Sequence, residues 1–185
     1  MTSSFEIQKT KIRGVSVLKR LPLKDSRGFF ERLYCTRELS LLLNGKSIVQ
    51  INHTMTKRSG TVRGVHFQHN PFAEIKVVNC IKGKAWDIAL DLRKGSPTFL
   101  QYHAEILSDD NHKTLVIPEG VAHGFQTLSD DCEMIYFHTK EYNSEAEGAL
   151  NAKDPQLNIQ WPLNIADISD RDRSHAMINE SFEGV

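Results

Sequence analysis

The residues whose types could carry out chemistry are densest between Gly60 and Lys76. Two histidines, an arginine, a glutamate and a lysine lie there among glycines and apolar residues, at Arg63, His66, His69, Glu74 and Lys76. If the strand alternates regularly, His66 and Gln68 lie on one face with Gly64, and Arg63 lies on the other. A face lined by glycine, histidine and glutamine has room for a ligand, so we expect His66 to face a binding site.

Metal binding is one chemistry that fits the histidines. The pattern is similar to small β-barrels of the cupin type, which often hold a metal with H-x-H, a following glutamate and a later histidine. The matching candidates are His66, Glu74 and His123. The second histidine of the H-x-H is replaced by Gln68, whose amide is a poorer ligand for a transition metal than imidazole.

Acid–base catalysis is the other chemistry, because the unperturbed pKa of imidazole lies closest to neutrality. A carboxylate would orient such a histidine, but spacing alone does not identify which one. Tyr136 is a further candidate; it shares a strand face with Met134 and His138, and either face of that strand could be the inner one. The histidines therefore leave both chemistries open.

Three cations are candidate phosphate ligands: Arg27, Arg63 and Lys76. Arginine suits bidentate recognition of phosphate oxygens. Gly28 and Gly64 follow the two arginines directly and would let a ligand approach the backbone closely. The alternative for each of these charges is simple solvation on the surface.

The elements that must position these residues are mostly short strands. The sequence predicts strands at Val15–Leu18, Ile48–Thr54, Thr61–Gln68, Ile75–Ile81, Lys84–Leu92, Phe99–Leu107, Thr114–Ile117, Gly124–Leu128 and Glu133–Thr139. Between the first two, residues 21–28 read as a turn-rich connector. A helix of two or three turns is expected with Thr36 as its N-cap, a leucine stripe at 39–43 and Gly45 as its stop. This pattern predicts an all-β sandwich or barrel with little helix.

Length and composition favour one soluble domain over residues 1–185. The chain has 185 residues, of which 39% are hydrophobic, enough for one sizeable core. Beyond Glu141 the strand pattern fades, and we expect residues 141–185 to wrap the barrel. The formal net charge of zero gives no reason to expect a nucleic acid or a membrane surface as partner.

Cellular location is also indicated by the sequence. The three cysteines, Cys35, Cys80 and Cys132, are widely spaced and include no CxxC, which argues against a disulfide framework or a zinc knuckle. The N-terminus has no apolar signal region, and no run approaches the length of a membrane span. We therefore expect a soluble, cytoplasmic protein.

Taken together, these motifs resemble the dTDP-4-dehydrorhamnose 3,5-epimerase family of sugar-nucleotide epimerases over nearly the whole chain. The matching segments are Asp25–Phe30, Ile48–Asn52, Thr61–Gln68, Asp87–Arg93, Ser96–Thr98, Ile117–Phe125, Asp154–Pro155, Ile159–Pro162 and Ile168–Asp172, together with Thr139, Tyr142 and Glu147. The resemblance implies a cupin-type jelly roll and an isomerase that acts on carbons beside a 4-keto group, with no metal and no cofactor.

The resemblance also implies roles for individual residues. His66 would be the general base, with Asp172 as its orienting partner. Lys76 would stabilise the enolate, and Tyr136 would return the proton on the other face of the sugar. The positions that match substrate contacts are Arg27, Gln50, Asn52, Arg63, His123, Glu147 and Arg171.

The implied assembly is a homodimer that exchanges strands. In it, Tyr142 matches the aromatic residue that stacks on the nucleotide base, and Phe30 matches a residue lent to the other subunit. The expected ligand is a nucleotide-diphosphate 4-keto-6-deoxy sugar of the dTDP-4-dehydro-6-deoxyglucose type. The expected reaction inverts C3, C5 or both by proton abstraction and redelivery through an enolate.

Three departures from the family pattern lie on the nucleotide side: Arg32, Ile51 and Asn143–Ser144. They lead to the hypothesis that the chemistry is retained while the nucleotide or sugar differs. The alternatives are an epimerase of one carbon on a CDP- or GDP-linked sugar, a metal-dependent cupin enzyme, a ketoisomerase, and a sugar-binding module without catalysis.

Overall fold

The computed structural model describes residues 3–185, and their secondary structure is almost entirely β. The strands are β1 (Phe5–Lys9), β2 (Ser16–Arg20), β3 (Leu23–Asp25), β4 (Gly28–Phe30), β5 (Gln50–Thr56), β6 (Thr61–Gln68), β7 (Lys76–Lys82), β8 (Lys84–Asp91), β9 (Tyr102–Ser108), β10 (Lys113–Ile117), β11 (Val121–Thr127), β12 (Cys132–His138), β13 (Glu147–Ala149) and β14 (Asp167–Ile168). Two short helices, α1 (Thr36–Leu39) and α2 (Asp170–Ser174), complete the described chain. The expected all-β class with a few short helices is confirmed.

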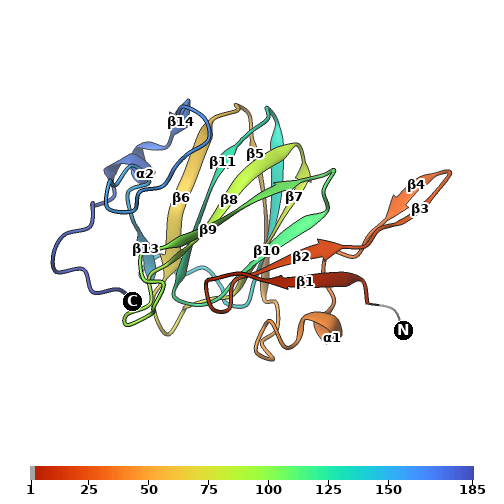
Figure 1. Cartoon of the computed structure of the whole chain (residues 1–185), viewed down its shortest axis with the longest axis horizontal. Helices are drawn as coiled ribbons and strands as arrows, with labels where there is room; N and C mark the ends of the chain where they lie inside the picture. The colour runs from red at the N-terminus through yellow and green to blue at the C-terminus, as the bar shows by residue number, and fades with distance from the viewer. Residues whose placement is uncertain (1–2) are drawn as a thin grey trace.

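All strands except β3 and β4 form two facing sheets (Figure 1). One sheet has the order β1-β2-β10-β7-β12-β5, and the other has the order β13-β6-β11-β8-β9. Apolar side chains from both sheets fill the space between them; Val78 and Met134 come from the first sheet, and Ala89 and Phe125 from the second. Because side chains alternate along each strand, each sheet turns one face toward this core and leaves the other to loops, helices or solvent.

The prediction that residues 21–28 form only a turn-rich connector is wrong. This segment forms the β3–β4 hairpin, in which Leu23 pairs with Phe30, and the hairpin projects away from the barrel (Figure 1). Gly28, the first residue of β4, follows the turn at φ +128°, and no atom lies within 4 Å of the position a Cβ would take. Gly28 therefore provides a backbone conformation that favours glycine in the hairpin, and the expected close approach of a ligand to it stays a prediction.

The predicted helix is shorter than expected. Helix α1 ends at Leu39, its N-cap residue is Cys35, and Thr36 is its first residue, so the assignment of Thr36 as N-cap is wrong. The leucines that follow lie in turns, where Leu43 is buried and Leu41 is exposed. Gly45, at φ +72°, donates its backbone N–H to Ser40 O and ends this turn as predicted.

Strand β6 contains an irregularity that decides which side chains reach the site. His66 pairs with His123 on β11, whereas Arg63 pairs with Phe125, so three steps on β6 face two steps on β11. This bulge breaks the alternation of side chains. The prediction that Arg63 and His66 lie on opposite faces is therefore wrong, because both side chains line the same cavity.

Gly64 allows the bulge to form. It has φ +114°, and a Cβ there would lie 2.7 Å from Gly124 Cα and 2.8 Å from His123 O. A side chain at this position would collide with the backbone of β11. Gly64 is thus required by close strand packing, and the expected approach of a ligand to its backbone is not its role.

The C-terminal segment returns to the same strand. Within it, β13 pairs antiparallel with β6, and β14 pairs parallel with β6. Helix α2 follows directly and lies beside β6 (Figure 1). Neither helix of residues 3–185 has the length and apolar character needed to span a bilayer.

Candidate active site

A cavity of about 500 Å³ opens between the two sheets, within the usual size range for small-molecule sites. The predicted site residues that line it are Asn52, Arg63, His66, Lys76, His123, Tyr136, Arg171 and Asp172. His66 is supplied by β6 of one sheet, and Tyr136 by β12 of the other. These two side chains therefore approach the cavity from opposite walls.

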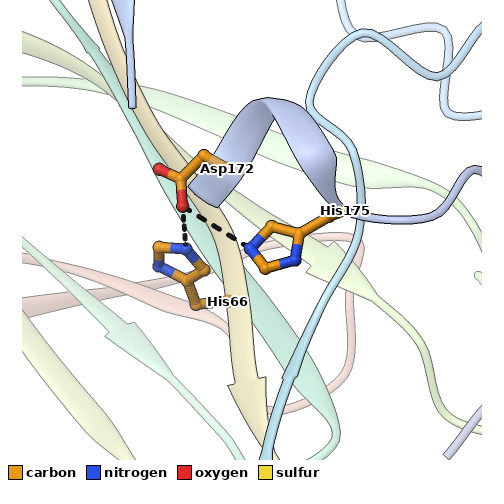
Figure 2. Close-up of side chains that lie close together, drawn as sticks. All are labelled: His66, Asp172 and His175. Atoms are coloured by element: carbon orange, nitrogen blue, oxygen red, sulfur yellow. Dashed lines mark hydrogen bonds and ion pairs between the residues drawn. The ribbon is translucent and has the colours of Figure 1, made fainter. Parts of the chain in front are cut away.

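His66 and Asp172 form a hydrogen-bonded pair (Figure 2). His66 Nε2 lies 2.8 Å from Asp172 Oδ1. The other carboxylate oxygen accepts the backbone N–H of Gly64 at 3.2 Å, and Ser169 caps α2 by accepting the N–H of Asp172. With Nε2–H donated to the carboxylate, the lone pair of Nδ1 is left to accept a proton.

The charge of Asp172 is stabilised by the same contacts. Burial raises the pKa of this carboxyl, but the hydrogen bond from His66, the charge on its imidazole and the N–H of Gly64 outweigh burial, and the pKa falls to about 2. Asp172 is therefore anionic at neutral pH. An anion at this position fixes the His66 ring and stabilises it when it gains a proton.

Tyr136 is nearly buried in the opposite wall. Its hydroxyl oxygen lies 3.1 Å from Thr54 Oγ1, and its ring packs edge-on against His123 with 5.8 Å between centroids. Burial raises the pKa of Tyr136 well above its ordinary value, and the nearby charge of Asp87 raises it further. The phenol is thus held protonated at neutral pH, which is the state needed to donate a proton.

Lys76 reaches the cavity beside a buried carboxylate. Its Nζ lies 3.2 Å from Glu74 Oε1, and the other oxygen of Glu74 lies 2.7 Å from His138 Nδ1. Burial raises the pKa of Glu74, but the hydrogen bond from His138 and the charge of Lys76 outweigh it and leave the pKa below its ordinary value. One buried anion therefore holds two cavity-lining side chains.

Two further predicted residues are fixed by hydrogen bonds. His123 Nε2 lies 2.9 Å from Asp87 Oδ2, whose pKa is raised by complete burial. Arg63 donates from Nε to Thr56 Oγ1 at 3.0 Å. Because Nε is occupied by Thr56, the terminal nitrogens of Arg63 are the part available to a ligand.

Three further predicted residues form a hydrogen-bonded rim of the cavity: Gln50, Tyr142 and Glu147. The rim connects Asn52 with Arg171, both of which line the cavity. Gln50 Nε2 donates to Asn52, and Gln50 Oε1 accepts the backbone N–H of Tyr142. The Tyr142 hydroxyl and Arg171 both donate to Glu147 Oε2 at 3.1 Å. Tyr142 is half exposed, which leaves a ring face open to stacking.

Arg27 and Phe30 are the two predicted residues that lie away from both the cavity and its rim. Both belong to the projecting hairpin, where Arg27 pairs with Asp25 at 2.6 Å and Phe30 is 66% exposed. Phe29 beside it is also exposed and contacts His112 edge-on. The exposed aromatic tip has no role in the cavity of its own chain.

The metal-site candidates are not brought together. His66, Glu74 and His123 each pair with a different residue, and no group of ligand atoms among residues 3–185 contains Glu74 or His123. Gln68, at the H-x-H position, accepts the backbone N–H of Asn143 and donates to two carbonyls, so its amide holds a loop. His69 is exposed and packs edge-on against Phe67.

Several contributors to the site were missed by the sequence reasoning. They are Thr54, Asp87, Phe125, His138, Ser169 and His175. The His138 side chain could have been selected, because it shares a strand face with Tyr136. Asp87 carried no such signal, because its partner His123 lies on another strand. His175 could have been selected from its position three residues after the predicted Asp172.

The family model for dTDP-4-dehydrorhamnose 3,5-epimerase matches residues 9–180 of the chain. A relative of that name from Salmonella typhimurium is 37% identical over 176 residues, which cover 94% of this chain and 96% of the relative.

Solved structures agree with this assignment. That of dTDP-4-dehydrorhamnose 3,5-epimerase from Bacillus anthracis, with TDP and PPi bound, has a TM-score of 0.90 and 36% identity, covering 94% of this chain and 99% of that one. That of dTDP-6-deoxy-D-glucose-3,5-epimerase from Legionella pneumophila, in complex with dTDP-4-keto-L-rhamnose, has a TM-score of 0.88 and 34% identity, with coverage of 94% and 92%. These likenesses confirm the expected cupin-type jelly roll. The chain belongs to the dTDP-4-dehydrorhamnose 3,5-epimerase family.

Proposed function

We propose that this chain is an isomerase that inverts C3 and C5 of a dTDP-linked 4-keto-6-deoxy sugar, of the dTDP-4-dehydro-6-deoxyglucose type. The observation that carries the proposal is the placement of the His66–Asp172 pair and Tyr136 on opposite walls of one cavity. Epimerisation needs proton removal on one face of the ring and delivery on the other. Two groups on opposite walls, one a base and one an acid, meet that need.

The proposed first step is proton abstraction next to the ketone. His66 Nδ1 takes the proton from carbon, the electrons of the C–H bond form a C=C bond, and the carbonyl electrons move to the 4-oxygen. Lys76 stabilises the resulting enolate oxygen as a preorganised cation in a partly buried cavity. Asp172 stabilises the imidazolium that forms.

The proposed second step returns a proton to the opposite face. Tyr136 donates its hydroxyl proton to carbon, the carbonyl re-forms, and Tyr136 recovers a proton while His66 loses one. The sugar has the same atoms and oxidation level at the end as at the start, so the step needs no electrons from a cofactor. The same pair of groups can act at C3 and at C5, because both carbons neighbour the 4-keto group.

The nucleotide is proposed to lie along the rim described above. Arg63 and Arg171 would contact the diphosphate, and Tyr142 would stack on the base, next to Glu147. We propose further that the active unit is a cytoplasmic homodimer of single-domain chains that exchange strands. In that dimer the projecting hairpin would bring Arg27 and Phe30 to the site of the other subunit, which gives its exposed aromatic tip a function.

A different nucleotide or a single inverted carbon is not favoured. The relatives are named for dTDP sugars, and the departing positions do not line the cavity. Arg32 is held by Ser4 and Glu38, Ile51 is exposed on β5, and Asn143 is bonded to Gln68.

The proposal is tested by NMR of dTDP-4-dehydro-6-deoxyglucose with the enzyme in deuterated water. Deuterium is expected at C3 and C5 together with an epimerised product. His66→Asn should abolish the exchange and largely keep dTDP binding, while His69→Asn, a change at an exposed histidine, serves as the matched control. Unchanged exchange in His66→Asn would remove His66 as base.

Other outcomes of the same experiment identify the alternatives. Exchange at one carbon indicates a single-centre epimerase, and much tighter binding of CDP or GDP than of dTDP overturns the nucleotide assignment. A product with the carbonyl on another carbon indicates a ketoisomerase. Activity lost to a chelator indicates a metal enzyme, and binding without exchange indicates a sugar-binding module.

A further inference from the structure

We propose that His66, Asp172 and His175 form a binding site for a divalent transition-metal ion such as Zn²⁺, and that the bound ion inactivates His66 as a base. The inhibitory part of this inference rests on the proposed role of His66 as base; the metal site itself does not. The three residues lie together at the cavity edge, and Figure 2 shows both imidazole rings turned toward the same carboxylate oxygen.

The donor atoms suit such an ion. His66 Nε2 lies 2.8 Å from Asp172 Oδ1, and His175 Nε2 lies 3.6 Å from the same oxygen. All three donor atoms lie within 4.8 Å of one another. In tetrahedral zinc sites, with bonds of about 2.0–2.2 Å, ligand atoms are about 3.3 Å apart, so small movements of the side chains would close the set. Two imidazoles and a carboxylate leave a position for water, and imidazole favours zinc, copper or nickel over magnesium or calcium.

The chain around the three donors is fixed. The carboxylate of Asp172 is oriented through its other oxygen, which accepts the N–H of Gly64. The buried Asn151 side chain donates to the carbonyl of His175 at 3.1 Å, and its backbone N–H binds Ala176 O. A site whose ligands are held in place loses little entropy when the metal binds.

The His175 ring packs edge-on against the His66 ring, with 6.0 Å between centroids. Its Nε2 is buried and has no hydrogen-bond partner among residues 3–185, and its distance of 3.6 Å from Asp172 Oδ1 is too long for a hydrogen bond. A buried nitrogen without a partner is uncommon, because its desolvation is not compensated. A metal ion shared with Asp172 and His66 would satisfy this atom.

The charge around the site permits a cation. Asp172 is anionic, and the nearest cation is Arg171, whose Nε lies 3.8 Å from Asp172 Oδ1. Arg171 is itself paired with Glu147 at 3.1 Å and is 56% exposed, so its charge is partly neutralised and the side chain is free to swing outward. Lys76, which also lines the cavity, is paired with Glu74. Arg63 is therefore the cavity cation that has no carboxylate partner among residues 3–185, and an entering divalent cation meets the Asp172 carboxylate at the cavity edge.

Metal binding and proton abstraction at His66 exclude each other. A metal on Nε2 takes the lone pair of that nitrogen, so the hydrogen that Nε2 donates to Asp172 must move to Nδ1. Nδ1 is the nitrogen that would accept the proton of the sugar, and it would then carry a hydrogen already. The bound ion would thus inactivate the base without occupying the sugar site.

Zinc binding to the whole enzyme is measured by competition with a chromophoric chelator, which requires no turnover. One Zn²⁺ per chain is expected at this site. His175→Gln should weaken binding at least about tenfold, whereas His69→Gln, a change at an exposed histidine outside the cavity, should leave it unchanged. The far-UV circular dichroism and thermal midpoint of each variant confirm that it is folded. Equal affinity in the wild type and His175→Gln overturns the site.

Inhibition is measured in the same preparations, with each variant compared with its own metal-free rate. Zn²⁺ should slow deuterium exchange of the wild type in proportion to its occupancy, and EDTA should restore it. His175→Gln should need at least about tenfold more Zn²⁺ for the same inhibition. Zinc that binds through His175 without slowing exchange overturns the competition with catalysis. A protein that binds zinc through His175 yet shows no exchange under any condition contradicts the proposed epimerase and leaves the metal site standing.

Discussion

Lys76 Nζ lies 3.2 Å from Glu74 Oε1 in the cavity wall, and both side chains are nearly buried, at 12% and 7% exposure. An ammonium group in this setting is held in place by its carboxylate and by the surrounding strands. It does not need to reorganise when charge develops on a neighbouring oxygen, which is the condition for strong electrostatic stabilisation of a transition state. The relationship therefore makes Lys76 the proposed enolate-stabilising group.

Replacement of Lys76 by Met removes this cation and keeps an unbranched side chain that is shorter by the ammonium group. We expect the rate of deuterium exchange at the sugar to fall about 10²–10³-fold, the range typical for loss of one such donor. Lys82→Met is the matched control, because Lys82 ends the same strand, is exposed and pairs only at the surface with Glu133. A Lys76→Met enzyme within about threefold of the wild type would contradict the assignment.

Replacement of Tyr136 by Phe should separate exchange from inversion. His66 would still remove a proton, so the recovered substrate should gain deuterium, while the epimerised product should form about 10²–10⁴-fold more slowly without its acid. NMR measures both rates in one sample. Thr54→Val, which removes the 3.1 Å contact to the hydroxyl and leaves the phenol, should have a much smaller effect. Equal losses of exchange and inversion in Tyr136→Phe would argue that Tyr136 acts before reprotonation.

Acid stability should depend on Asp172. Its pKa is lowered from the unfolded value of 3.8 to about 2 in the fold. A carboxyl shifted in this direction stabilises the protein above its unfolded pKa, and this contribution disappears as the pH falls from about 4 to about 2. The shift corresponds to about 2 kcal/mol of unfolding free energy.

The test compares urea unfolding at pH 5 and near pH 2. Asp172→Asn should lose about 2 kcal/mol less of its unfolding free energy over this interval than the wild type does. Asp110→Asn, at an exposed aspartate on the surface, is the control and should follow the wild type. Parallel curves for Asp172→Asn and the wild type would show that the His66–Asp172 pair adds no acid-labile stability.

Gly64→Ala should destabilise the barrel more than an ordinary glycine substitution. The new methyl group would lie 2.7 Å from Gly124 Cα. In addition, the alanine would have to adopt the positive φ of Gly64, +114°. Gly95→Ala, at φ +73° with no atom within 4 Å, carries only the backbone term, about 1–2 kcal/mol. Urea unfolding at fixed protein concentration should place Gly64→Ala at least about 1 kcal/mol below Gly95→Ala. Equal losses of unfolding free energy in Gly64→Ala and Gly95→Ala would mean that β6 and β11 move apart at no cost to accommodate the methyl group.

The strands that carry the site could be predicted from local sequence. The range Thr61–Gln68 agrees with β6 residue for residue, and the predicted strand at Glu133–Thr139 differs from β12 by one residue at each end. Apolar and β-branched runs between turn residues determine these elements, because the alternation of a strand is a property of consecutive residues. The strand register, by contrast, brings together residues that are far apart in the chain.

Two predictions from the sequence are wrong for the same physical reason. Periodicity placed Arg63 opposite His66, yet the bulge that Gly64 allows beside Gly124 puts both side chains into one cavity. The leucine stripe after Thr36 predicted a longer helix. Instead, Leu39 at the end of α1 and Leu43 in the turns that follow it are both buried in one apolar cluster with residues of the first sheet. In both cases tertiary contacts override a local pattern.

The sequence by itself determined the β architecture, the histidine and tyrosine on separate strands, and the family resemblance. The resemblance paired Asp172 with His66, and the tertiary structure gave that pair its geometry, with 2.8 Å between Oδ1 and Nε2. Only the tertiary structure showed that Glu74 pairs with Lys76 and His138, and that His175 faces the same Asp172 oxygen. Strand patterns depend on neighbours two residues apart, whereas a hydrogen bond or an ion pair depends on positions in space, which chain closure and strand pairing set together.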